Sequence, residues 1–273
     1  MWRRQTPGKL DRELLAVWFV LPMAKTPTTG ICRLCLQQGV LVDSHIVPNF
    51  LCKPMRQKEK FYLAISTDPE VDTSKKQKFI TEYLLCPKCD NERLSECENH
   101  FRKVFFGGYP IGGKVSGIFH TFTGFDYVLL KNALLSILWR MSLSTHRFYR
   151  QVSLGQKHEE RLRQILLNRQ KTDPLEYSIH LSVPVLEGIV GPDISVGPDS
   201  VRQDNNRVYR CLISGLLFSF MVGSAPVTKG YAPEALNETE LVAVILDVEN
   251  IPFLKAAFIE VAKAEAERAK ASA

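Results

Sequence analysis

The sequence predicts an α+β fold in two parts, a small cysteine-rich N-terminal module and a larger region of helices packed against a mainly antiparallel sheet. Four of the seven cysteines form two Cys-x-x-Cys pairs, and both pairs lie before residue 90. Beyond residue 110, segments with helical periodicity are followed by segments in which apolar and polar residues alternate. With 273 residues, of which 45% are hydrophobic, the chain is long enough to bury a large core.

We expect residues 1–27 to be an N-terminal extension. Basic residues precede the apolar run 14–21, an order typical of a secretory signal, but Asp11 and Glu13 interrupt it. The alternative expectation is that Met23 is the start and that residues 1–22 have no folded role. No apolar run reaches the length of a membrane-spanning helix, which predicts a cytoplasmic protein with no membrane partner.

Residues 28–110 form the predicted cysteine-rich module, whose four paired cysteines are Cys32, Cys35, Cys86 and Cys89. Four thiolates in two such pairs match the tetrahedral ligand set of a structural Zn²⁺, so we predict one shared zinc ion. Two unrelated thiol pairs are the alternative, because a redox pair is usually single and lies beside a βαβ pattern. The remaining cysteines, Cys52, Cys97 and Cys211, are predicted to be buried core residues. Cys52 and Cys97 could alternatively substitute as zinc ligands. An odd cysteine total with zinc-type spacing indicates a reducing compartment.

The segment between the two pairs carries a further motif. After the first pair, residues 42–48 read Val-Asp-Ser-His-Ile-Val-Pro, and the second pair is followed by Asp90 and Asn91 at the start of a predicted helix. This order resembles the HNH, or ββα-metal, nuclease family in its zinc-stapled form, in which zinc holds the hairpin and the helix together. The resemblance covers residues 30–105 and implies a treble-clef-like module.

The resemblance also implies roles for individual residues. His45 corresponds to the general base that activates the hydrolytic water. The preceding position, usually Asp or His, is Ser44 here, with Asp43 one residue earlier, and the position after the last cysteine, usually His or Asn, is Asp90 followed by Asn91. These positions would hold a catalytic Mg²⁺ or Mn²⁺. On an α-helix, Glu98 shares a face with Asn91 and could replace the missing carboxylate, or it is an ordinary solvated charge.

Charge is uneven along the chain. The formal net charge is +6, and residues 1–110 hold 17 Lys and Arg against 12 Asp and Glu. Basic residues flank the predicted site and could contact phosphate, which predicts a nucleic-acid partner, DNA rather than RNA: Lys53, Arg56, Lys58, Lys75, Lys76 and Lys78. The alternative interpretation is that these residues belong to solvated basic loops. The sequence pI near 8.9 is modest for a dedicated nucleic-acid-binding protein.

Residues 111–273 form the second predicted part, after a glycine-rich joint at 106–113. Helices are predicted over 127–141, which is apolar on nearly all sides, over 156–171, and over 252–271. Strands are predicted over 177–183, over 208–222 with a bend at Gly215, and over 241–248, with a hairpin turn at 204–206.

No catalytic constellation is recognisable in this second part, which leaves recognition, oligomerisation or a protein partner as its predicted roles. For the whole chain three hypotheses follow: an HNH-like endonuclease, a non-catalytic zinc-stapled nucleic-acid-binding protein, or an interaction scaffold with structural zinc only. Similarity to bacterial proteins of this arrangement implies a role in defence against foreign DNA.

Overall fold

The computed structural model describes residues 27–56, 60–107, 113–186, 189–190, 194–223 and 234–271. The predicted N-terminal extension, apart from residue 27, and Lys58 lie outside these residues. Among the helices that are described, none is both long and apolar enough to cross a membrane.

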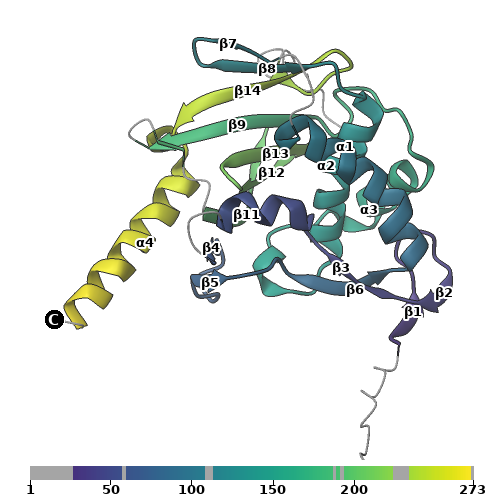
Figure 1. The fold of residues 1–273 in the computed structure, drawn as a ribbon, viewed down its shortest axis with the longest axis horizontal. Helices are drawn as coiled ribbons and strands as arrows, with labels where there is room; N and C mark the ends of the chain where they lie inside the picture. The colour runs from purple at the N-terminus through teal and green to yellow at the C-terminus, as the bar shows by residue number, and fades with distance from the viewer. Residues whose placement is uncertain are drawn as a thin grey trace, which may run out of the picture.

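The cysteine-rich part contains two hairpins and a helix (Figure 1). The first hairpin pairs β1 (Thr29–Ile31) with β2 (Gln38–Val40), and the second pairs β3 (Val42–His45) with β6 (Thr81–Leu85). A π-helical segment, η3 (Lys88–Leu94), follows β6 and continues directly into α1 (Ser95–Phe106). The strands β3 and β6, which pair with each other, are therefore separated in sequence by a long insertion.

The insertion between β3 and β6 has structure of its own. Short 3₁₀ helices follow Pro48, and then two strands form a hairpin: η1 (Asn49–Cys52), η2 (Pro54–Arg56), β4 (Tyr62–Ile65) and β5 (Ser74–Lys76). This hairpin does not pair with β3 or β6. It instead joins the edge of the large sheet, where β4 runs parallel to β11.

The large sheet has ten strands in the described part of the chain, in the order β5-β4-β11-β12-β13-β9-β14-β8-β7, with β10 paired to β9. Its remaining strands are β7 (Gly113–Ser116), β8 (Phe119–Thr123), β9 (Ile179–Leu186), β10 (Ile189–Val190), β11 (Ile194–Gln203), β12 (Asn206–Ile213), β13 (Leu216–Val222) and β14 (Glu240–Asp247). Only the pairs β4/β11 and β9/β14 are parallel among the described strand pairs. The predicted α+β fold with a mainly antiparallel sheet is thus confirmed.

Three longer helices belong to the second part: α2 (Tyr127–Leu143), α3 (Gly155–Asn168) and α4 (Pro252–Ala271). Short 3₁₀ helices, η4 (Arg147–Tyr149) and η6 (Val248–Asn250), precede α3 and α4. Helix α2 packs between α1 and α3, and its residues from Leu130 to Met141 are all buried. Its nearly uninterrupted apolar sequence requires such a central position. Helix α4 packs on the sheet through residues near its start and then projects away from the body (Figure 1).

One strand prediction was wrong. Residues 208–222 do not form a single bent strand, because Ser214 and Gly215 both have positive φ and make a hairpin turn between β12 and β13. The turn at Asp204 and Asn205, also with positive φ, is confirmed. β11 was missed because Gly197 and Pro198 interrupt its apolar pattern.

The predicted boundary at residue 110 falls within residues 108–112, which are not described. Strands from both sides of it share the large sheet, and the main core cluster includes residues of both sides, such as Leu34, Phe101, Leu134 and Phe218. The division into 28–110 and 111–273 stays a prediction, while the two parts share one sheet and one core cluster.

Candidate metal centre

The four paired cysteines come together at one point. The Sγ atoms of Cys32, Cys35, Cys86 and Cys89 all lie within 4.8 Å of one another, and the Sγ atoms of Cys35 and Cys86 are 3.9 Å apart. With zinc–sulfur bonds of about 2.3 Å, tetrahedral geometry places sulfurs roughly 3.8 Å apart. The arrangement fits a single metal ion held by all four thiolates.

Backbone turns set this arrangement. At the first pair, the Leu36 N–H donates to the Cys32 carbonyl. Leu36 also has a positive φ, which turns the chain back toward β2. At the second pair, the N–H groups of Cys89 and Asp90 both donate to the Cys86 carbonyl. The Arg33 N–H donates to the Leu84 carbonyl and joins the two turns. Backbone hydrogen bonds therefore shape both turns and join them to each other.

The chemistry of the donor set also fits a cation. Burial raises the pKa of the Cys35 and Cys89 thiols. Burial also disfavours ionisation of Cys32, but backbone N–H donors from Cys35, Cys86 and Leu34 outweigh it and lower the pKa of that thiol. Four neighbouring thiols cannot all ionise without a compensating positive charge, and a divalent metal ion supplies that charge.

The second part of the chain holds the first cysteine turn in place. Arg163 on α3 donates from Nη1 to the Leu34 carbonyl at 2.7 Å, and its other nitrogens bind the Glu160 carboxylate. Leu34 and Arg163 are both buried. The cysteine cluster is thus braced by α3, although α3 lies more than a hundred residues later in the sequence.

Beside the cluster, β3 carries the predicted catalytic residues. The pairing with β6 has a bulge between Val42 and Asp43. Beyond it Asp43 is exposed, Ser44 is fully buried and His45 is half-buried at the strand end. The Ser44 hydroxyl donates to the Val42 carbonyl at 3.4 Å. The bulge therefore places Ser44 inside and Asp43 in solvent.

The helix after the second cysteine pair carries the other predicted site residues. Asp90 is half-buried and its carboxylate has no hydrogen bond or ion pair to any residue described, while Asn91 is exposed. Because residues 88–94 wind as a π-helix, the α-helical phase that would align Asn91 with Glu98 does not apply across them.

Glu98 is committed to another contact. Its Oε1 accepts from Arg140 Nη2 at 2.6 Å, and Arg140 Nη1 donates to the His45 carbonyl at 2.7 Å. Arg140 also bonds Ser136, and its side chain is 2% exposed. This buried arginine on α2 links β3, α1 and the helical core. Sequence reasoning missed it, although a charge near the end of an otherwise apolar helix is a signal for a buried ion pair.

His45 is surrounded by charges of both signs. Burial and the positive charge of Arg140 lower the pKa of its imidazole, and the negative charges of Asp90, Glu98 and Asp43 act in the opposite direction without reversing the shift. His45 is therefore neutral at physiological pH, the form in which an imidazole accepts a proton.

The predicted basic residues divide between two places. Lys53 and Arg56 line a surface hollow of about 380 Å³ together with Lys60 and Gln77. Arg56 Nε is buried and has no hydrogen-bond partner among the described residues. Lys75, Lys76 and Lys78 are exposed on β5 and just after it, and Lys76 lines a different cavity.

No other group of three or more His, Cys, Asp or Glu side chains with metal-ligand spacing occurs in the part of the chain that is described. Asp43, His45, Asp90 and Glu98 therefore do not form a closed ligand set. Comparison with protein-family models, curated proteins and solved structures finds no match for this chain. The resemblance to HNH nucleases rests on the sequence motifs alone.

Proposed function

We propose that this chain is a zinc-stapled, HNH-like endonuclease that hydrolyses phosphodiester bonds of nucleic acid, DNA in preference to RNA. The observation that carries the proposal is the position of a neutral, half-buried His45 at the end of β3, in the electrostatic field of the unpaired Asp90 carboxylate on the helix that opens at the second cysteine pair. The cysteine cluster supports a structural Zn²⁺ that holds the hairpin and helix in register.

The residues suggest a division of labour. His45 would accept the proton of the attacking water, and the Arg140 bond to its carbonyl would hold the end of β3 in place. A Mg²⁺ or Mn²⁺ ion would neutralise charge that develops on the phosphate. Asp90 is the carboxylate available to hold such an ion, with Asn91 and Asp43 as exposed neighbours. Glu98 is not available, because it pairs with Arg140.

The basic hollow supports a nucleic-acid substrate. Lys53, Arg56 and Lys60 line it without an acidic side chain among its described lining residues. The Arg56 guanidinium contributes to the lining of this hollow, and phosphate oxygens are suitable acceptors for a guanidinium.

A second candidate is a protein that binds nucleic acid without cutting it. The burial of Ser44 and the commitment of Glu98 to Arg140 favour it, because both remove oxygen ligands from the vicinity of His45. It shares the zinc cluster and the basic hollow with the first proposal, so cleavage alone separates the two.

Replacing His45 by alanine is expected to lower cleavage of DNA in the presence of Mg²⁺ or Mn²⁺ by at least about 100-fold, since a positioned general base contributes roughly 10²–10⁴ in rate. Asp90→Asn should cause a comparable loss. Zinc content and thermal stability of both variants should stay at the wild-type level. His120→Ala, on β8, is the matched control and should cleave normally.

The pH profile supplies a second readout for the same proposal. Because the pKa of His45 lies below that of a free imidazole, the acidic limb of kcat/KM should fall below pH 6.5 and cleavage should be constant above it until other groups titrate. Wild-type protein that binds DNA but does not cut it under these conditions would favour the second candidate. Cleavage that persists in His45→Ala without added metal would place the site elsewhere.

The salt dependence of binding is expected to depend on the basic hollow. Combining Lys53→Gln, Arg56→Gln and Lys60→Gln should reduce the log–log salt slope by roughly 2 to 3, because each phosphate contact contributes about 0.7–0.9. The matched control changes Lys171, Lys255 and Lys263 to Gln. Those lysines pair with Glu238, Glu249 and Glu260, so the same net charge is removed away from the hollow. An equal change in both variants would show that only overall charge matters.

A further inference from the structure

A partly open cavity of about 250 Å³ lies between the β4–β5 hairpin and the second part of the chain. Its apolar walls come from both sides of residue 110 and include Val47, Ala64, Phe79, Met141, Val196 and Ile213. Asp68, whose side chain is 1% exposed, pairs at 2.9 Å with Arg150, the residue after η4, and so joins the segment after β4 to the second part of the chain. The exposed side chains of Glu70 and Arg147 form a second pair between the same segments.

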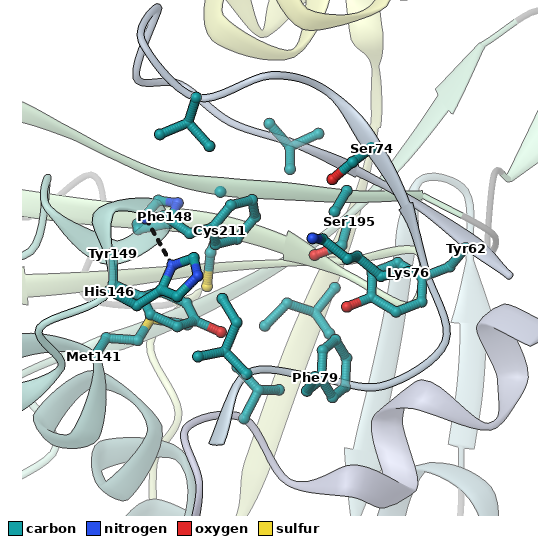
Figure 2. A pocket seen from close by; sticks show the side chains of 18 of the residues that line it. Tyr62, Ser74, Lys76, Phe79, Met141, His146, Phe148, Tyr149, Ser195 and Cys211 are labelled. Atoms are coloured by element: carbon teal, nitrogen blue, oxygen red, sulfur yellow. Dashed lines mark hydrogen bonds between the residues drawn. The ribbon is translucent and has the colours of Figure 1, made fainter. Parts of the chain in front are cut away.

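Four polar groups point toward the middle of this cavity (Figure 2). They are the hydroxyls of Tyr62, Tyr149 and Ser195 and the ammonium group of Lys76. The Tyr62 hydroxyl already donates to the Lys78 carbonyl at 3.3 Å. Tyr149 and Ser195 are 2% and 5% exposed, yet their hydroxyls form no hydrogen bond within the described structure. The Lys76 ammonium likewise has no acidic partner there.

Neither hydroxyl is among the buried polar atoms that lack a partner, so both oxygens are accessible from the cavity and can bond a ligand or water there. A ligand with hydrogen-bonding oxygens would satisfy both. Lys76 adds a positive charge at the exposed rim of the cavity, where Asp72 is the acidic residue among the lining side chains.

Size and wall chemistry narrow the ligand further. A cavity of about 150 Å³ accommodates benzene, so about 250 Å³ corresponds to roughly ten non-hydrogen atoms. The rings of Phe79, Phe148 and Tyr149 line it and favour a planar aromatic body. Covalent capture by Cys211 is disfavoured, because burial raises the pKa of that thiol to about 12.

We infer that this cavity binds a small aromatic carboxylate, with the ring between the apolar walls and the carboxylate at Lys76, Ser195 and Tyr149. The inference does not rest on nuclease activity. Because the walls belong to both the β4–β5 hairpin and the second part, the bound ligand would stabilise the contact between them.

The test measures binding of 3-hydroxybenzoate and its neutral counterpart 3-hydroxybenzamide to the full chain, by calorimetry and thermal shift. The expected result is a dissociation constant below about 1 mM for the carboxylate, at least tenfold tighter than for the amide. Lys76→Met should abolish this preference, and Tyr149→Phe should weaken carboxylate binding severalfold. Lys75→Met is the matched control: it lies on the same strand, its side chain alternates to the opposite face, and binding should be unchanged.

Thermal unfolding of each variant without ligand checks that the fold is intact. Two results would overturn the inference. The first is the absence of any shift with 3-hydroxybenzoate up to 1 mM, roughly the weak limit set above, which would leave ordered water as the partner of the two hydroxyls. The second is equal carboxylate binding by wild type and Lys76→Met.

Discussion

Changing any one of Cys32, Cys35, Cys86 or Cys89 to serine should abolish stoichiometric zinc binding and unfold the two hairpins of the cysteine-rich part. The four sulfurs lie within 4.8 Å of one another, so each is a ligand of the same proposed ion. Structural zinc contributes on the order of 10 kcal/mol or more to small zinc-dependent units, which is comparable with the whole stability of a typical domain. Elemental analysis and hydrogen exchange over residues 27–56 and 81–106 would measure both effects.

A buried cysteine outside the cluster provides the control. Cys97 is 1% exposed on α1, and Cys97→Ala should keep one zinc per chain with a loss of stability of about 1–2 kcal/mol, typical of a small core substitution. Wild-type protein that contains no zinc, or serine variants that keep it, would contradict the assignment of the four cysteines to one metal.

Replacing Arg140 by methionine should destabilise the protein by about 3–5 kcal/mol, because removal of one partner of a buried ion pair leaves the other charge unpaired. Glu98 would lose its bond at 2.6 Å, and the His45 carbonyl would lose its donor at 2.7 Å. Chemical unfolding would measure the change. The double variant Arg140→Met with Glu98→Gln should recover part of the loss, because the partly buried side chain at position 98 then carries no unpaired charge.

The exposed ion pair between Arg147 and Glu70 is the matched control. Both side chains are more than half exposed, and Arg147→Met should change stability by less than about 1 kcal/mol. An equally small effect at Arg140 would show that its contacts carry little of the fold. Glu98→Gln alone also separates roles: it should affect stability and leave metal-dependent cleavage largely intact, whereas Asp90→Asn should do the reverse.

Several elements were predictable because their signals are local. Helix α2 follows from an apolar run that can only be buried, α4 begins at the proline where the sequence predicts it, and the turn at Asp204 and Asn205 follows from residues that tolerate positive φ. The second turn, at Ser214 and Gly215, also consists of two residues with positive φ. It was missed because the apolar residues on both sides extend the strand pattern across it.

The candidate site was predictable only in its ligand types. Cys-x-x-Cys spacing follows from the need of one ion for two thiolates from a tight turn, so the cysteine cluster could be predicted without knowing the fold. Which carboxylates are available as metal ligands could not be predicted. The sequence gives no sign that Glu98 pairs with Arg140, because Arg140 lies 42 residues later in the chain.

The sequence by itself determined the α+β class and the four-cysteine cluster, because residue spacing and periodicity encode both of them. Only the tertiary structure decided that β4 and β5 join the large sheet, that Arg140 engages Glu98 and that Asp43 faces solvent. It also decided that Tyr149, Ser195 and Lys76 converge on one cavity. Those outcomes depend on contacts between distant segments, and burial energy selects such contacts through the packing of the whole core rather than through any local pattern.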